Sequence, residues 1–215
     1  MILLTGGSGQ LGYELQKYLK MYGITDVRAP SHQELDVRYP MEKRNYSMVI
    51  HAAAYTDVKG AEKLQSVCWD TNVNGTRNLV EVYQDIPFVF ISTEYAKNPM
   101  NHYAKSKRAA EDIVATHPQH LIVRTSFKPR PFPFAKAFVD QFTGGDYVDN
   151  IAWRIVQLIE KWDRKSKMVY VHTGRKSIYD LAVQTRPDVG MMSIKDVKDV
   201  ILPEDTYDSS LAAND

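Results

Sequence analysis

The segment Met1-Ile-Leu-Leu-Thr-Gly-Gly-Ser-Gly-Gln-Leu-Gly12 decides how the rest of the chain folds. Its apolar run from Ile2 to Leu4 is typical of a short buried strand, and apolar residues then recur at helical spacing from Leu11 to Tyr22. Glycines separate the two patterns at positions 6, 7, 9 and 12. The order strand, glycine turn, helix predicts the first βα unit of a Rossmann-type, doubly wound α/β fold with a parallel sheet.

The glycine turn has a use beyond tight packing. Glycine has no Cβ, so a pyrophosphate can approach the backbone closely, and the free N–H groups at a helix N-terminus attract an anion. The spacing here is GxxGxxG, whereas the common dehydrogenase fingerprint is GxGxxG. The turn therefore predicts a dinucleotide site, although three glycines in a βα turn also serve close packing alone.

Length and composition narrow the possible functions. The 215 residues are long for one domain and short for two, so we expect one α/β core with a small appendage. A formal net charge of +1 provides no strong field for nucleic acid or an anionic membrane, which favours a small-molecule partner. The single cysteine, Cys68, excludes an internal disulfide, and the six histidines lack metal-ligand spacing, so we expect no metal. With no leader and no long apolar run, we expect a cytoplasmic protein.

The end of the second predicted strand, residues 25–29, is where such folds distinguish NADP from NAD. An acidic residue there would bind the ribose 2′-hydroxyl, and an arginine would accommodate a 2′-phosphate. The strand ends in Arg28, which predicts a preference for NADP(H), with NAD(H) also usable. Arg28 as a solvated surface charge is the alternative.

Two further apolar segments predict buried strands that end at the same edge of the sheet. Residues 47–54 end in three alanines, whose small side chains leave room for a cofactor, and residues 88–91 precede Ser92-Thr-Glu-Tyr95. Between them, residues 58–83 have a helical pattern, which we expect to break near 70–74.

Tyr103 and Lys107 stand four residues apart at the start of a predicted helix and share one of its faces. An ammonium beside a phenol lowers the pKa of the phenol from near 10 toward a value useful for proton transfer. A hydroxyl from Ser92 or Thr93 would hydrogen-bond a substrate oxygen, so together these groups would polarise a carbonyl. A Tyr and a Lys at this spacing are usually only a packing pair, but here they follow the glycine turn and the Ser-Thr strand end in the order that this chemistry requires.

In its first 127 residues the chain resembles extended short-chain dehydrogenase/reductases, within them the dTDP-4-dehydrorhamnose reductase (RmlD-like) family. The matching motifs are Gly9-Gln-Leu-Gly12, Glu34-Leu-Asp-Val37, His51-Ala-Ala-Ala-Tyr-Thr56 with Ala61-Glu62, Asn72, Ser92-Thr-Glu-Tyr95, Tyr103 with Lys107, and Arg124-Thr-Ser126.

The resemblance implies an NAD(P)H-dependent reductase that delivers hydride to C4 of a 4-keto-6-deoxy nucleotide sugar. Tyr103 would donate the proton, Lys107 would lower its pKa and hold the nicotinamide ribose, and Thr93 would position the carbonyl. Asp36 and Val37 would lie near the adenine. The full set of implied cofactor-binding residues is Gly6, Gly9, Gln10, Leu11, Gly12, Arg28, Asp36, Val37, Ala52, Ala53, Ala54, Tyr55, Ser92, Tyr103 and Lys107. The implied substrate-binding residues are Thr93, Glu94, Tyr95, Arg124 and Ser126.

The chain departs from the family in three places. Glu94 stands where the family usually has Asp, the segment 96–102 is too short for the family's substrate loop, and the part after residue 127 is reduced. We expect a Rossmann domain at 1–127, a small substrate-binding region at 128–208 and a disordered tail at 209–215.

The small region contains a proline-rich linker at 128–133 and a predicted short helix carrying the stripe Phe134, Phe138 and Phe142. Asp149 is the expected N-cap of a helix over 151–162, and a strand and a helix are expected at 168–171 and 177–184. Four basic side chains could meet a nucleotide-sugar diphosphate, namely Arg124, Lys128, Arg130 and Lys136, with a solvated charge as the alternative for each.

Two other functions fit the same fold. An NAD-dependent nucleotide-sugar epimerase or dehydratase would recycle the hydride, and a non-catalytic NADP-binding regulatory subunit would keep the fold without turnover. The intact Thr93, Tyr103 and Lys107 favour a catalyst, whereas the short loop favours the regulatory subunit. The helices at 58–83 and 103–117 could also form a homodimer contact.

Overall fold

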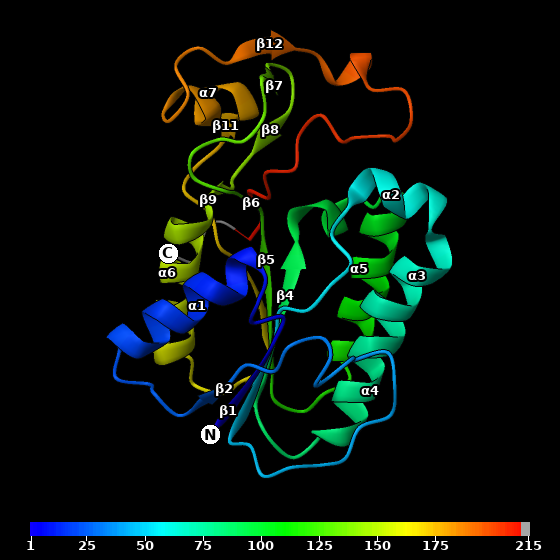
Figure 1. Ribbon diagram of the computed structural model, residues 1–215, viewed down its shortest axis with the longest axis vertical. Helices are drawn as coiled ribbons and strands as arrows, with labels where there is room; N and C mark the ends of the chain where they lie inside the picture. Colours follow the sequence, from blue (N-terminus) through cyan, green and yellow to red (C-terminus); the bar gives the residue numbers. More distant parts are fainter. Residues whose placement is uncertain (212–215) are drawn as a thin grey trace.

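The computed structural model describes residues 1–211 and is built on one parallel sheet (Figure 1). Its six strands lie in the order β10-β5-β4-β3-β1-β2. They span β1 (Ile2–Thr5), β2 (Val27–Arg28), β3 (Met48–His51), β4 (Phe88–Thr93), β5 (His120–Thr125) and β10 (Lys167–Tyr170). The predicted doubly wound α/β fold is confirmed.

Helices cover both faces of this sheet. One face packs against α1 (Gln10–Met21) and α6 (Val148–Lys161), with Leu15 and Ile155 fully buried between them and the strands. The other face packs against α4 (Gly75–Val82) and α5 (His102–Val114), where Leu79 and Ala110 are fully buried. The apolar runs in the strands are buried on both sides because of these two layers.

The helical stretch after β3 is interrupted at Leu64, which was not predicted, and at the predicted position 70–74 the helix changes to a π-helical turn without ending. It consists of α2 (Val58–Lys63), α3 (Gln65–Trp69), a π-helical turn over Asp70–Asn74, and α4. Such π-helical turns occur frequently at functional sites. This one turns Asn72 inward, where its amide pairs with the backbone N–H and C=O of Tyr55.

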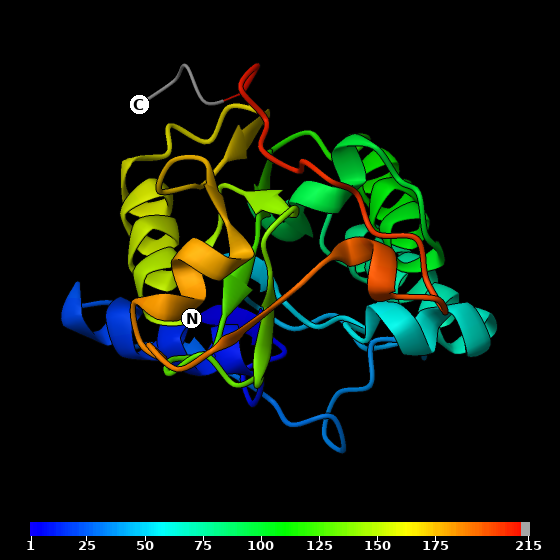
Figure 2. The same ribbon diagram turned by 90° about the horizontal axis from the view of Figure 1, so that it is seen from above.

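A small lobe lies beyond the carboxyl ends of the strands (Figure 1). It contains β7 (Lys136–Phe138), β8 (Phe142–Thr143), β11 (Lys176–Ser177), α7 (Ile178–Val183) and β12 (Gly190–Met192). The pair β6 (Phe127–Lys128) and β9 (Asp146–Tyr147) connects this lobe to the main sheet. In Figure 2 the chain after β12 crosses from the lobe toward α2, and Lys59 in α2 forms an ion pair with Asp199. Among residues 1–211, no helix is long and apolar enough to cross a bilayer.

The predicted division at residue 127/128 does not match the sheet. Strand β10 pairs with β5 in the main sheet, and α6 packs on α1, so both belong to the Rossmann unit although they lie in the predicted substrate region. A strand and an amphipathic helix carry no local signal of which sheet they join, and the pairing with β5 decides it.

Three local predictions are also corrected. The stripe Phe134, Phe138 and Phe142 lies on no helix, because Phe138 and Phe142 belong to strands β7 and β8. Helix α6 begins at Val148 with Tyr147 as N-cap, and Asp149 lies in its first turn, where it pairs with Arg130. Of the tail predicted to be disordered, residues 209–211 form a turn, and residues 212–215 lie outside the described residues.

Candidate active site

A cleft of about 870 Å³ lies between the carboxyl edge of the sheet and the small lobe. Its walls come from the glycine turn after β1, the loop after β2, the alanines after β3, the end of β4, the start of α5 and the segment after β5. Ligands of open α/β sheets bind at this edge. The cleft therefore lies where the topology predicts a site.

The glycine turn forms a cradle that side chains would fill. Gly6 has a positive φ of 74°, and a Cβ there would lie 2.6 Å from the backbone nitrogen of Ala53. A Cβ on Gly12 would lie 2.1 Å from the carbonyl oxygen of Gly6. Helix α1 begins after Gly9, and no side chain caps it. The first backbone N–H groups of the helix therefore have no side-chain acceptor at the N-cap. This geometry fits a phosphate group.

A buried histidine supports the floor of this cradle. The Nδ1 of His51 lies 2.7 Å from Thr5 Oγ1, and its Nε2 lies 3.0 Å from Thr76 Oγ1. Burial, followed by the charge of Lys107, lowers the pKa of His51 to about 3, so the ring is neutral. Thr5 also accepts a hydrogen bond from the N–H of Ala53, which ties the alanine segment to β1.

Thr93, Tyr103 and Lys107 line the same cleft. Asn101 caps α5 by accepting a hydrogen bond from Ala104 N, and this fixes Tyr103 in the first turn of the helix. The ammonium of Lys107 is buried, donates to the carbonyl oxygen of Ile91 at 2.8 Å and lies 4.1 Å above the centre of the Phe90 ring. The end of β4 and the start of α5 thus converge on one point.

The pKa values in this site differ from the expected pattern. Burial raises the pKa of Tyr103 to about 12, and a hydrogen bond with Thr93 opposes the change only in part. The prediction that Lys107 lowers this pKa is therefore wrong for the structure as it stands. Burial lowers the pKa of Lys107 itself to about 7, against the opposing charge of Glu111. The phenol of Tyr103 is consequently protonated at neutral pH, which is the form that can donate to a carbonyl oxygen.

Most of the residues predicted for the cofactor and the substrate lie in the cleft. The acidic residue among them, Asp36, is bound by Arg38, whose side-chain hydrogen bonds hold the pKa of the carboxyl below its usual range. The predicted residues that line the cleft are Gly6, Gly9, Gln10, Leu11, Gly12, Asp36, Val37, Ala52, Ala53, Ala54, Ser92, Thr93, Tyr95, Tyr103, Lys107 and Ser126.

Arg28 and Tyr55 do not line the cleft. Arg28 pairs with Leu3 in the sheet, and the cleft wall begins two residues later, at Pro30. His32 lies in the cleft wall instead. Tyr55 contributes its backbone to Asn72.

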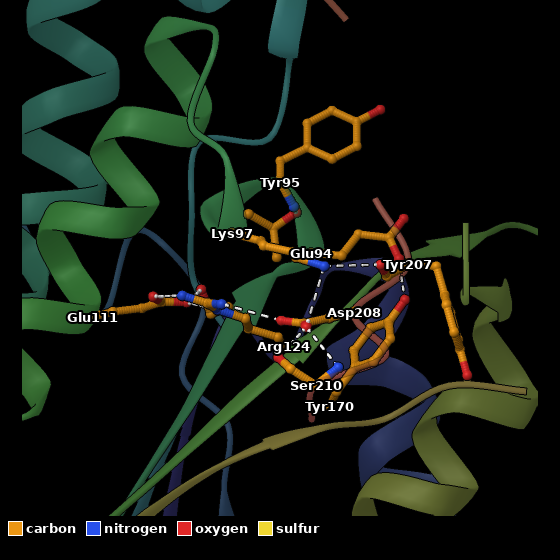
Figure 3. A network of polar contacts seen from close by, with 11 residues as sticks. Glu94, Tyr95, Lys97, Glu111, Arg124, Tyr170, Tyr207, Asp208 and Ser210 are labelled. Carbon is orange, nitrogen blue, oxygen red and sulfur yellow. Dashed lines mark hydrogen bonds and ion pairs between the residues drawn. The ribbon is translucent and has the colours of Figure 1, made fainter. Parts of the chain in front are cut away.

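Glu94 and Arg124 were predicted to face the substrate, and both are buried in polar networks outside the cleft (Figure 3). The Glu94 carboxylate accepts hydrogen bonds from Tyr170 Oη at 2.6 Å and Thr206 Oγ1 at 2.5 Å, and also from Thr143. The Arg124 guanidinium pairs with Glu111 at 2.7 Å and Asp208 at 3.6 Å. These partners hold the lobe and the C-terminal segment on the sheet.

Several further residues line the cleft, and of these only Lys128 was predicted from the sequence, as a basic side chain that could meet a diphosphate. Six of them follow the end of a main-sheet strand by two to four positions, namely Ser8, Pro30, His32, Phe127, Lys128 and Pro129. The additional lining residues are Ser8, Pro30, His32, Leu35, Thr56, Val58, Thr71, Ile91, Thr125, Phe127, Lys128, Pro129, Pro133 and Phe134.

Comparison with known proteins agrees with this geometry. The dTDP-4-dehydrorhamnose reductase of Aggregatibacter actinomycetemcomitans is 28% identical over 225 residues, which cover 85% of this chain and 76% of the relative. The protein of that name from Mycobacterium tuberculosis (strain ATCC 25618 / H37Rv) is 28% identical over 151 residues, and the match covers 59% of this chain and 49% of that relative. The chain thus spans about half the length of the mycobacterial relative.

Solved structures share the fold. A dTDP-4-dehydrorhamnose reductase from Clostridium acetobutylicum superposes with a TM-score of 0.83 at 24% identity, over 95% of this chain and 88% of that chain. A second, from Bacillus anthracis in complex with NADP, has a TM-score of 0.80 at 24% identity and covers 96% and 88% of the two chains. A family model described as the RmlD substrate binding domain matches residues 1–128. With more than half of its length matched by this model, the chain belongs to the RmlD family, as its motifs predict.

Proposed function

We propose that the protein is an NAD(P)H-dependent reductase of a 4-keto-6-deoxy nucleotide sugar, with chemistry of the short-chain dehydrogenase/reductase type. The observation that carries the proposal is one continuous cleft that holds an anion cradle at Gly6–Gly12 and a carbonyl-polarising group of Thr93, Tyr103 and Lys107. The names of the relatives, dTDP-4-dehydrorhamnose reductase, support the same substrate class.

The residues of the cleft fit a dinucleotide. The first turn of α1 would hold the pyrophosphate, Asp36 and Val37 would lie beside the adenine, and the segment 52–54 would lie under the ribose and pyrophosphate. Lys107 would hold the nicotinamide ribose through its ammonium. When bound, the nicotinamide supplies the hydride that reduces the carbonyl carbon.

The side chains of the site supply the proton. Thr93 hydrogen-bonds the carbonyl oxygen and fixes its position, while Tyr103 donates its phenolic proton to that oxygen as the carbon accepts the hydride. The carbonyl becomes a secondary alcohol and Tyr103 becomes a phenolate. The positive charge of Lys107 stabilises this phenolate, and this stabilisation arises in the step itself, when the negative charge develops.

The cleft supports use of both NADP(H) and NAD(H). The lining residues after β2 are Pro30, His32 and Leu35, and the next acidic lining residue, Asp36, is neutralised by Arg38. No carboxylate of the described part of this wall is therefore left to repel a 2′-phosphate. The NADP complex of the Bacillus anthracis neighbour supports the same choice.

The proposal also assigns a role to each part of the chain and a location in the cell. The Rossmann unit, which includes α6 and β10, would bind the cofactor, and the small lobe would cover the nucleotide sugar. A cytoplasmic location is proposed with it, since the chain's single cysteine, Cys68, provides no disulfide framework of the kind common in secreted proteins.

The decisive measurement is oxidation of NADPH and NADH by the purified protein in the presence of dTDP-4-keto-6-deoxy sugar. We expect turnover with the wild type and a fall in kcat of about 10²-fold or more in Tyr103→Phe, the range of a lost general acid. Binding of NADP⁺ should be retained by this variant. Tight binding of NADP⁺ by a wild type that does not turn over would contradict the reductase and favour a cofactor-binding subunit.

A further inference from the structure

The structure separates the four basic side chains that could meet a diphosphate near the lobe. Arg124 is paired with Glu111 and Asp208, and Arg130 is paired with Asp149. Lys136 lies exposed on β7, outside the cleft. Only the fourth, Lys128, lines the cleft.

Lys128 is a desolvated cation without a direct partner. It lies in β6, whose pairing with β9 places it between the main sheet and the lobe (Figure 1). Within residues 1–211 its ammonium has no hydrogen bond and no ion pair, and the charge of Glu94 acts on it only from a longer range. Burial lowers its pKa, so the fold pays a free energy to keep this charge in the cleft wall.

The other basic side chains of the cleft differ in this respect. Lys107 donates to the carbonyl oxygen of Ile91, and His32 lies 3.4 Å from the carboxylate of Asp36. Lys128 is therefore the cation of the described cleft that is left for an anionic ligand.

The sheet order separates Lys128 from the glycine cradle. The cofactor cradle follows β1, whereas Lys128 follows β5, and β3 and β4 lie between them. Three strand spacings separate the two positions by about 14 Å. Thr93, at the end of β4, pairs with Thr125 at the end of β5, so Lys128 lies on the side of the cleft where the reacting sugar would be held. A phosphate bound there belongs to the substrate rather than to the cofactor pyrophosphate.

We propose that Lys128 is a substrate-binding residue whose ammonium pairs with the diphosphate that joins the sugar to its nucleoside. This inference rests on the proposed function, which supplies a substrate containing such a diphosphate. Pairing with phosphate oxygens would offset the desolvation of the ammonium, and the gain would appear as affinity for the nucleotide part of the substrate. The residue would leave the chemical step itself to Tyr103 and Lys107.

The test is a calorimetric titration of thymidine diphosphate into the protein saturated with NADP⁺, which measures the Kd of the nucleotide. Uridine diphosphate is titrated in the same way as a second probe. We expect the Kd of the bound nucleotide to rise about 10- to 100-fold in Lys128→Met, the effect of losing one charge-assisted contact. Lys128→Arg, which keeps the charge, should recover most of the affinity. Lys136→Met removes an exposed lysine of the same region and should behave as the wild type.

Three outcomes would overturn the inference. The first is an unchanged nucleotide affinity in Lys128→Met, and the second is no binding of either nucleotide by the wild type. The third is that Lys128→Met loses affinity for NADP⁺ and not for the nucleoside diphosphate. Failure of the proposed function is seen separately, as absent turnover of the 4-keto sugar by a wild type that still binds a nucleoside diphosphate through Lys128. Conversely, if the wild type is active and Lys128→Met has the same KM for the 4-keto sugar, the assignment of Lys128 to the substrate diphosphate fails and the proposed function stands.

Discussion

The ammonium of Lys107 shows how a single residue combines fold and chemistry. It is buried beside the Phe90 ring with one carbonyl partner, and this desolvation lowers its pKa from 10.5 to about 7. A developing phenolate at Tyr103 would provide the negative charge that the ammonium lacks in the free protein. The site thus stores an unfavourable electrostatic free energy that the reaction can use.

This arrangement predicts a pH dependence of stability. Between pH 7 and about 10.5 the unfolded chain binds more protons at Lys107 than the folded chain does, so the free energy of unfolding should increase with pH in this range. Below pH 7 both states carry the proton, and the unfavourable contribution is constant. Urea unfolding at pH 6, 7, 8 and 9 should therefore show the wild type gaining stability relative to Lys107→Met above pH 7.

The exposed Lys136→Met serves as the control for this measurement. Its free energy of unfolding should keep a constant difference from that of the wild type over the same pH range. A constant difference for Lys107→Met as well would mean that Lys107 is hydrated in the folded protein, against the burial described above.

At the scale of elements, the first βα unit depends on close approach of backbones. Gly12 lies in the first turn of α1, and its missing Cβ lets the helix rest on the turn that contains Gly6 and Gly7. The atoms that a side chain would meet are backbone atoms, which cannot rotate away. The position of α1, and with it the direction of its N-terminal N–H groups, depends on this contact.

We expect Gly12→Ala to lose about 1–3 kcal/mol of stability, the range for overpacking a rigid site. An added Cβ would lie 2.1 Å from the Gly6 oxygen and 2.7 Å from the Gly7 Cα, so α1 must shift and NADP⁺ affinity should fall at least tenfold. Thermal unfolding and a fluorescence titration measure the two effects. Gly190→Ala is the matched control, because its Cβ would meet the Lys136 side chain at 3.3 Å and the Ala135 carbonyl oxygen at 3.4 Å, with no atom as close as at Gly12. Equal NADP⁺ affinity in both variants would refute the proposal that the glycine turn binds the cofactor pyrophosphate.

At the scale of the whole molecule, Glu94 joins three parts of the chain. It follows β4 at the edge of the main sheet, and it accepts hydrogen bonds from Thr143 in the lobe, Tyr170 at the end of β10 and Thr206 in the C-terminal segment. Near it, Arg124 and Asp208 make a second connection between sheet and C-terminal segment (Figure 3). The lobe is held over the cleft by these buried polar contacts as well as by the small apolar core around Tyr147.

Glu94→Gln should therefore lower the free energy of unfolding by about 2–3 kcal/mol, because hydrogen bonds to a buried carboxylate are replaced by weaker ones to an amide. The C-terminal segment should also become accessible, so trypsin should cut faster at Lys195 and Lys198. Glu160→Gln, the same change at an exposed position of α6, should stay within about 0.5 kcal/mol of the wild type. A variant of Glu94 with normal stability and a raised substrate KM would restore its predicted role at the substrate.

The features that could be predicted from the sequence are those with local causes. The glycine turn, the helix after it and the π-helical turn at 70–74 depend on residues close in sequence, and the helical spacing of Tyr103 and Lys107 already places them on one face. The convergence of strand ends at one edge follows from parallel topology, so most of the residues predicted for the cofactor lie in one cleft.

The sequence by itself thus determined the fold class, the family and the residues of the candidate site along the chain. Only the tertiary structure decided which strands share a sheet, which charges are neutralised and which remain open. Glu94 meets partners 49, 76 and 112 residues away, and no periodic pattern encodes such a choice. The same holds for Lys128, for which a diphosphate contact and a solvated charge could not be told apart until the fold placed it in the cleft wall. Burial and pairing depend on contacts between distant segments, and these exist only once the whole chain has folded.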